Sequence, residues 1–254
     1  MITGSSAGIG EATATLLAGE GVRVVVHGRD AGRANSVAES IRDSGGVADV
    51  ALGGLSSDEG ADAVVAEALR GGGIDILVNN AGVYEHRSWN ELGSERWLDT
   101  YQRNVVSGVR LINRLVPAIR DRGWGRVIQV GGGLAIQPVA AQPDHNATLA
   151  ARHNLAVSLA RECAGTGVTS NVVAPGAILV PSVRELLISA APGHGWGESW
   201  AEIESGAVRE FVPNDVGRFG RPEEIAVAYL ASPWADYVSG AVLRVDGGTI
   251  RSVN

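Results

Sequence analysis

The segment TGSSAGIG at residues 3–10 decides the fold prediction for this chain. It connects a short apolar start to a helical run that begins at residue 9, so it lies between a strand and a helix. In such a turn, Gly4 allows the tight bend, Gly8 lets a phosphate approach the backbone, and Gly10 allows close helix packing. The helix N-terminus adds N–H groups and positive dipole. We therefore predict a dinucleotide pyrophosphate site formed by Gly4, Ser5, Ser6, Gly8, Ile9 and Gly10.

Apolar runs and helix-forming segments alternate along the rest of the chain. Runs typical of strands buried on both faces occupy residues 22–29, 47–52, 74–80, 125–132, 168–175 and 241–248. Segments typical of helices occupy residues 9–19, 31–44, 57–70, 94–121, 144–165 and 222–232. This alternation predicts an α/β fold with a doubly wound parallel sheet covered on both faces. Because no repeat or linker interrupts it, we expect one domain over residues 1–254.

Residues 178–220 break this alternation. They contain no obvious strand, and an amphipathic piece lies around GWGESWAEIES. A long excursion after the carboxyl end of a strand suggests a lid over the ligand crevice. A surface helical insertion explains the same pattern. In the lid interpretation, Trp196 and Trp200 are four residues apart and would cover a flat substrate, although packing of the lid explains them equally well.

Composition limits the classes of function. The net charge of −7 argues against a nucleic-acid partner, and no apolar run reaches the length of a membrane span. The single cysteine, Cys163, cannot form an internal disulfide, and no basic-then-apolar leader opens the chain, so we expect a cytoplasmic protein without membrane partners. The opening MITGSS leaves about three residues for a first strand, where five or six are usual. Either the true start lies upstream or this strand is short.

Arg29 indicates which dinucleotide would bind. It follows Gly28 at the end of the second predicted strand, where an acidic residue would bind the ribose 2′-hydroxyl and an arginine accommodates a 2′-phosphate. This favours NADP(H) over NAD(H). Alternatively, Arg29 is a solvated charge that pairs with Asp30.

Several motifs together resemble the short-chain dehydrogenase/reductase family over essentially the whole chain. They are TGSSAGIG (3–10), NNAG (79–82), the Asn104 of YQRNVVSG, PGAI (175–178) and RVDGG (244–248). The resemblance implies a Rossmann-type domain that assembles into a homodimer or homotetramer. It also implies that Asn80, Ala81 and Gly82 line the adenosine side, that Pro175, Gly176 and Ile178 line the nicotinamide, and that Leu55 contacts the cofactor.

The family's chemistry rests on an Asn–Ser–Tyr–Lys set, of which this chain keeps only Asn104. In the family, the asparagine maintains a proton relay through water. Aligning LAVSLARE (155–162) puts His145 in the tyrosine position, Leu149 in the lysine position and Gly132 in the serine position. All 21 basic residues are arginines, so no change of register restores a Tyr-x-x-x-Lys pair. The four tyrosines are Tyr84, Tyr101, Tyr229 and Tyr237.

Two smaller departures concern the cofactor. Gly54 stands where the family usually carries an aspartate that binds the adenine, and Val180 replaces a threonine that often binds the nicotinamide amide. Each change would weaken cofactor binding by about one hydrogen bond, roughly 1 kcal/mol.

Three groups could supply the missing proton. His145 could donate one near neutral pH, with Asp144 either orienting its ring or capping the helix. The substrate could instead carry its own acid, a phenol beside the ketone. The glycines at residues 131–133 would then leave room for a flat aromatic polyketide. Of these, we predict that Gly132 and Gly133 contact the substrate. In the YEHRSW segment (84–89), Tyr84 or His86 is the third possibility.

Three functions fit these residues. The first is an NADPH-dependent reductase of an aromatic ketone that supplies its own proton. It is suggested because the chain resembles atypical angucyclinone ketoreductases, such as the one of simocyclinone biosynthesis, which act in the production of antibiotics. The second is a non-catalytic nucleotide-binding partner or regulator. The third is a non-redox cyclase, dehydratase or lyase that uses His145.

Overall fold

The structure is a computed structural model that describes residues 1–225 and 227–252. Its strands are all parallel and form two sets. In one set β1 pairs with β2, and in the other the order is β3, β4, β5 and β6. Ile2 bridges Val26 of β1 and Val78 of β3, which joins the two sets into one sheet. The strands are β1 (Val24–Gly28), β2 (Ala48–Leu52), β3 (Ile76–Asn79), β4 (Gly125–Val130), β5 (Val168–Pro175) and β6 (Val242–Val245). All six predicted strands are confirmed, and with them the α/β class.

The stretch before the glycine turn supplies very little strand. Ile2 N–H donates to Val25 O at 3.1 Å, and Thr3 N–H donates to Val78 O at 2.9 Å. These bonds place the turn between the carboxyl ends of β1 and β3, where the sheet reverses its winding direction. Ligands of open α/β sheets bind at this point.

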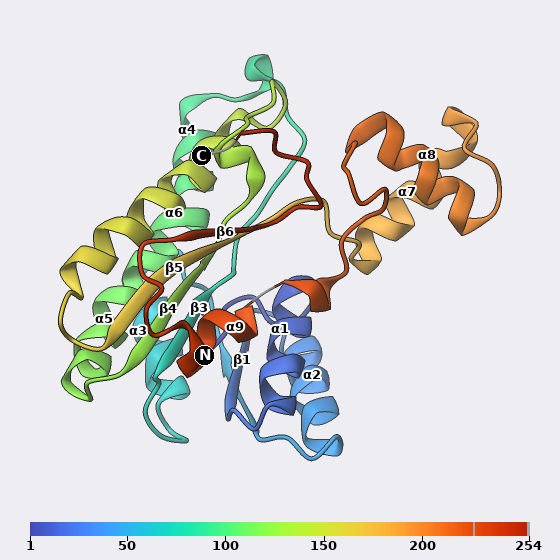
Figure 1. The fold of residues 1–254 in the computed structure, drawn as a ribbon. Coiled ribbons are helices and arrows are strands. Elements are labelled where there is room, and N and C mark those ends of the chain that lie inside the picture. Colours follow the sequence, from blue (N-terminus) through green and yellow to red (C-terminus); the bar gives the residue numbers. More distant parts are fainter. Residues whose placement is uncertain (226, 253–254) are drawn as a thin grey trace.

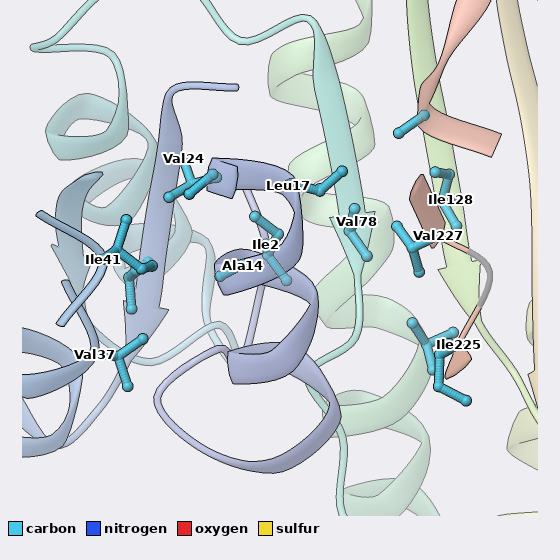
Figure 2. Packing of buried hydrophobic residues seen from close by; sticks show 14 of the residues in the cluster. Ile2, Ala14, Leu17, Val24, Val37, Ile41, Val78, Ile128, Ile225 and Val227 are labelled. Carbon is cyan, nitrogen blue, oxygen red and sulfur yellow. The ribbon is translucent and has the colours of Figure 1, made fainter. Parts of the chain in front are cut away.

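Helices cover both faces of the sheet (Figure 1). On one face α1, α2 and α9 pack with strand residues such as Val24 and Ile128, and on the other face α3, α5 and α6 pack with neighbours such as Val25 and Val127. Successive strand residues point to opposite faces, so one apolar run serves both cores. Figure 2 shows the first core, with α1 lying against β1 and β3. The helices are α1 (Gly8–Gly19), α2 (Ala31–Asp43), α3 (Asp58–Ala68), α5 (Ser107–Asp121), α6 (Pro143–Glu162) and α9 (Val227–Ala231).

The helix predicted over residues 94–121 is interrupted. α4 (Ser94–Tyr101) passes through a π-helical turn (Gln102–Val106) before α5 begins. The side chain of Asn104, in the middle of that turn, bonds both backbone groups of Val83. This long-range contact holds the widened turn, a feature that often occurs at functional sites.

The helix predicted over residues 222–232 is also shorter than expected. A 3-10 turn (Pro222–Glu224) ends where Ile225 adopts an extended backbone, and α9 begins at Val227. Residue 226 lies outside the described residues. Pro222 starts the turn well because its own N–H is not needed there.

The excursion at residues 178–220 forms a helical hairpin. α7 (Pro181–His194) and α8 (Trp200–Phe211) project away from α4, α5 and α6 (Figure 1). Its two ends meet, since Ile178 bridges Gly220 and Leu179 N–H donates to Gly220 O at 2.8 Å. The hairpin has its own apolar core. Residues 178–220 therefore form a closed structural unit, which we call the lid hairpin after the interpretation given in the sequence analysis.

Two kinds of feature are absent from the residues that the structure describes. No helix in that part of the chain combines the length and apolar character needed to cross a membrane. Nor do three or more His, Cys, Asp or Glu side chains gather there in a way that could hold a metal ion.

Candidate functional site

The glycine turn has the backbone geometry that its sequence predicts. Gly4 and Gly8 have φ angles of 63° and 62°, a region that favours glycine. A Cβ atom on Gly10 would lie 2.4 Å from Gly4 O and 2.8 Å from Ser5 Cα, so no side chain fits. The N-cap of α1, Ala7, forms no side-chain cap. The first turn of α1 is therefore open to an anion, as the dipole of the helix favours.

The side chains of Thr3 and of Asn80, the residue directly after β3, brace this turn. Thr3 Oγ1 accepts hydrogen bonds from the backbone N–H groups of Asn80 and Ala81, both at 2.9 Å. The Asn80 side-chain amide donates to Thr3 O at 2.9 Å and Gly4 O at 3.1 Å. The structure thus brings Gly4, Asn80 and Ala81 together, although Asn80 uses its amide to hold the turn.

His27 also holds the turn, a role that no sequence pattern indicated. Its Nδ1 accepts a hydrogen bond from Gly4 N–H at 3.1 Å, so the imidazole is neutral with its proton on Nε2. Burial lowers the pKa of His27 to about 4, with a smaller lowering by Arg29, while the Gly53 backbone partly raises it. Ser5 completes the contact, since His27 N–H donates to its Oγ at 2.9 Å.

Arg29 is exposed beside this turn, and within residues 1–225 and 227–252 its side chain has no hydrogen bond or ion pair. The alternative pairing with Asp30 is wrong. Asp30 instead caps α2, accepting from Arg33 N–H at 3.0 Å. A Cβ on Gly28 would meet Ser6 Oγ at 2.8 Å, so this glycine lets Ser6 lie against the end of β1. Leu55, which was predicted to contact the cofactor, instead has its side chain buried in the core formed with α3 and α5.

Asn104 connects two sides of the crevice. Its Oδ1 accepts from Val83 N–H at 2.7 Å, and its Nδ2 donates to Val83 O at 2.9 Å and to Thr148 Oγ1 at 3.1 Å. Thr148 donates in turn to His145 O at 2.8 Å. Asn104 therefore fixes the loop after β3 against α6, and its side chain is fully occupied in doing so.

Arg152 is a second residue with a role in the crevice that was not predicted from the sequence. Its Nε donates to Asn104 O at 2.5 Å, its Nη1 to Val130 O at 2.6 Å, and its Nη2 to Ala81 O. The Asn104 carbonyl thus bonds to a guanidinium, where the family resemblance implied a water relay. Burial lowers the pKa of Arg152 to about 10, so it remains charged at neutral pH. A signal was present, since residues 145, 149, 152 and 156 recur at helical spacing on one face of α6.

His145 lies at the crevice, but its environment opposes a charged ring. Burial lowers the pKa of His145, and the Arg152 charge lowers it further. Its ring is 5.9 Å from that of Tyr84, and both line a cleft of about 10 Å³, room for about one water molecule. Asp144 neither caps α6 nor orients the ring: Gln142 is the N-cap, and Asp144 Oδ2 accepts from Thr100 Oγ1 at 2.7 Å.

The predicted space at the glycines of residues 131–133 is wrong. A Cβ on Gly132 would meet Leu149 Cδ1 at 2.9 Å, and one on Gly133 would meet Ile250 Cγ1 at 2.8 Å. At Gly131 the neighbour is His153 Nε2, at 2.6 Å. Other side chains therefore fill the volume that a serine would use, and these glycines do not enlarge the pocket.

The tryptophan cover predicted for the substrate is also wrong. Trp196 is buried in the core of the lid hairpin, stacks on His194 at 4.5 Å and donates from Nε1 to Glu210 at 2.9 Å. It precedes α8 rather than lying on it. Trp200 bonds Glu204 at 3.1 Å, and the Arg184 guanidinium lies 4.7 Å from its ring centroid. The packing alternative holds, with both indoles used inside the hairpin.

The loop after β5 joins the two halves of the crevice. A Cβ on Gly176 would lie 2.8 Å from Asp246 Cα, so this glycine permits close backbone approach. Gly176 and Ile178 line a cavity of about 190 Å³ beside β6. Val180 Cγ1 would be 3.4 Å from a Cβ on Gly8, which places the start of the lid hairpin against the glycine turn. Pro175 ends β5 directly before this loop.

Comparison with known proteins identifies the family. The model described as short chain dehydrogenase matches residues 1–189. The uncharacterized oxidoreductase YvaG of Bacillus subtilis is 34% identical, with 100% of this chain and 96% of that protein covered. The crystal structure of L-sorbose reductase from Gluconobacter frateurii complexed with NADPH and L-sorbose has a TM-score of 0.90 and 34% identity, covering 99% of this chain and 96% of that one. A variant of the actinorhodin polyketide ketoreductase with NADPH has a TM-score of 0.88 and 30% identity, covering 99% and 96%. The chain therefore belongs to the short-chain dehydrogenase/reductase family of nicotinamide-dependent oxidoreductases.

Proposed function

We propose that this protein is an NADPH-dependent ketoreductase of an aromatic, angucyclinone-type polyketide ketone in antibiotic biosynthesis. The observation that carries the proposal is the braced glycine turn with the unpaired Arg29 beside it. The similarity to an actinorhodin polyketide ketoreductase with NADPH supports both the cofactor and the substrate class. Pro175, Gly176 and Ile178 would lie along the nicotinamide, and Asn80, Ala81 and Gly82 along the adenosine side, with Leu55 contributing only backbone contacts.

The cofactor would supply the hydride, and a phenol of the substrate itself would supply the proton. A phenol hydrogen-bonded to the ketone within the substrate would pass its proton to the carbonyl oxygen as hydride reaches the carbon. Solvent then reprotonates the phenolate. Support comes from the crevice itself: Leu149 fills the space at Gly132, and the lowered pKa of His145 disfavours an imidazolium donor at neutral pH. The residues of this chain position the reactants, and such positioning contributes a large share of catalysis.

A pair of ketones tests this proposal. Purified protein with NADPH should reduce an ortho- or peri-hydroxyaryl ketone, followed by loss of absorbance of the reduced nicotinamide. The O-methyl ether of the same ketone, which cannot donate the proton, should react about 10²-fold to 10⁴-fold more slowly, the usual contribution of a general acid. Binding of NADPH without reduction of any hydroxyaryl ketone would contradict the proposal. It would favour the nucleotide-binding partner or the non-redox enzyme instead.

Replacing Arg29 should separate the two dinucleotides. In Arg29→Ala, we expect the dissociation constant of NADPH to rise about 10-fold to 100-fold, because charged hydrogen bonds to the 2′-phosphate are worth roughly 1.5–3 kcal/mol. Affinity for NADH should stay within about twofold of the wild-type value, since NADH lacks that phosphate. Fluorescence titration measures both constants.

Arg33→Ala is the matched control for Arg29→Ala. Arg33 belongs to the same segment but lies 3.9 Å from Asp30 as its ion-pair partner. Equal loss of NADPH affinity in the two variants would show only a general effect of positive charge and would remove Arg29 as the selective residue.

Replacing His145 should have a small effect on reduction. In His145→Phe, we expect kcat for a hydroxyaryl ketone to fall by no more than about tenfold, less than the usual loss of a general acid. Phenylalanine keeps the ring contact with Tyr84. A fall of about 10³-fold in kcat, with NADPH affinity unchanged, would instead assign the proton to His145. Tyr84→Phe checks in the same way whether the neighbouring hydroxyl contributes.

Assembly into a homodimer or homotetramer is part of the same proposal. Three exposed aromatic side chains, Tyr229, Trp234 and Tyr237, lie close together in sequence before β6 and support it. Analytical ultracentrifugation should show a species of two or four chains. A monomer at micromolar concentration would contradict this part without affecting the reductase proposal.

A further inference from the structure

Arg152 carries a buried charge without a carboxylate partner. Its three hydrogen bonds all go to backbone carbonyls, at Ala81, Asn104 and Val130. Among the residues that the structure describes, no Asp or Glu forms an ion pair with it. Carbonyl dipoles solvate a cation only in part, and a buried charge that is not neutralised is costly. A purely packing role would not need such a group.

The three carbonyls come from three elements that border the crevice. Ala81 follows β3, Val130 ends β4, and Asn104 occupies the π turn before α5. One rigid guanidinium therefore fixes the carboxyl ends of two neighbouring strands to the turn opposite them. Because the fork of donors is planar, it sets direction as well as distance.

Gly82 lies over this charge, next to Val83, which lines the small cleft with Tyr84 and His145. Gly82 is exposed, and a Cβ placed on it would lie 3.2 Å from Arg152 Nη2 and 3.1 Å from Asn104 Oδ1. The guanidinium thus lies directly beneath backbone that solvent and ligands can reach. At this depth, a charge acts through a lower effective dielectric than water provides.

We propose that Arg152 is the positioning residue of this crevice, and that its charge, between Gly82 and the cleft lined by Val83 and His145, favours an anionic oxygen on the bound substrate. For a hydroxyaryl ketone, that oxygen is the phenolate left when the substrate donates its proton. In this form the proposal rests on the proposed function. The presence of the charge does not depend on that function, and its effect on His145 can be measured without turnover.

His145 is a natural probe of that charge. It stands two helical turns before Arg152 on α6, with Asp144 and His86 as its other charged or titratable neighbours affecting its pKa. Tyr84, Glu85, Arg87, Asp99 and Arg103 line the same small cleft. Only Arg152 is changed between the variants below, so these other groups contribute equally to each.

Two variants separate charge from hydrogen bonding. Arg152→Gln keeps an amide donor for the carbonyls without the charge, and Arg152→Lys keeps the charge with a different geometry. We expect the pKa of His145, read from its ring-proton NMR signal, to rise in Arg152→Gln by on the order of 0.5 unit relative to the wild type. In Arg152→Lys it should stay low. Equal shifts in both variants, or none in Arg152→Gln, would overturn the charge proposal.

Ligand selectivity tests the role toward the substrate. With NADP⁺ bound at pH 7, where Arg152 keeps its charge, the wild-type protein should prefer 2-hydroxy-1,4-naphthoquinone, whose acidic hydroxyl group is ionised, over its neutral 2-methoxy ether. In Arg152→Gln, the ratio of the dissociation constants of the two compounds should fall about tenfold toward one. In Arg152→Lys, most of the preference should remain. A normal His145 response with no loss of preference would leave the charge in place but overturn its action on the substrate. Failure of wild-type protein to reduce any ketone, with both binding results as expected, would count against the proposed function alone.

Discussion

Gly10→Ala should abolish useful binding of NADPH. We expect the dissociation constant to rise by at least about 100-fold and the free energy of unfolding to fall by roughly 1–3 kcal/mol, the usual cost of overpacking. The added methyl group would lie 2.4 Å from Gly4 O, 2.6 Å from Asn80 Nδ2 and 2.8 Å from Ser5 Cα. Two of these atoms belong to the backbone, so α1 must move away from the turn. Calorimetric titration with NADPH and urea unfolding measure the two effects.

Gly19→Ala provides the matched control in the same helix. Gly19 is the last residue of α1, and a Cβ placed on it meets nothing within 4 Å. Alanine stabilises a helix by up to about 1 kcal/mol relative to glycine, so this variant should be as stable as the wild type or more so. NADPH affinity should not change. If Gly10→Ala bound NADPH as Gly19→Ala does, the pyrophosphate would not lie at this turn.

The fold was predictable because its signals are local. The turn requires glycine at positions 4, 8 and 10, so the motif can be read directly from the sequence. The apolar runs likewise have the length of buried strands. The π turn was not predictable, since it depends on a contact between Asn104 and Val83, 21 residues away. A sequence pattern records the periodicity of a helix but not a distant partner that widens one of its turns.

The candidate site was harder to predict because neighbours decide what a side chain can do. Missing side chains at Gly132 and Gly133 suggested open space, yet Leu149 and Ile250 fill it. Trp196 was equally compatible with a substrate cover and with a core, and the lid hairpin turned out to have a core of its own. Arg152 could have been found from helical spacing alone. The role of His27 could not, because it depends on which atom approaches its ring.

His27 should make stability strongly dependent on pH. Its folded-state pKa of about 4 lies below the ordinary value of 6.5, so between these values the unfolded chain binds more protons than the folded one. Stability therefore rises with pH across this window and is lost as pH falls from about 6.5 toward 4. A shift of this size corresponds to about 3 kcal/mol in full, of which about 2 kcal/mol should be lost by pH 5.

His27→Asn should remove most of this dependence, because the asparagine side chain can accept from Gly4 N–H but does not titrate. Urea unfolding from pH 7.5 to 5 measures the slope for each variant. The exposed His86, changed to Gln, is the control and should keep the wild-type slope. His145 and His153 also have pKa values lowered by burial, so some dependence should remain in His27→Asn.

The same protonation should reach the cofactor through the turn. A proton on Nδ1 of His27 would face the Gly4 N–H that it now accepts from at 3.1 Å, turning an attraction into a repulsion between two donors. NADPH affinity of the wild-type protein should therefore fall more steeply with pH than that of His27→Asn, because titration of the 2′-phosphate at about pH 6 affects both proteins equally. Identical pH profiles for the two proteins would mean that some other group titrates at the turn, and that the bond between Gly4 and His27 does not hold its shape.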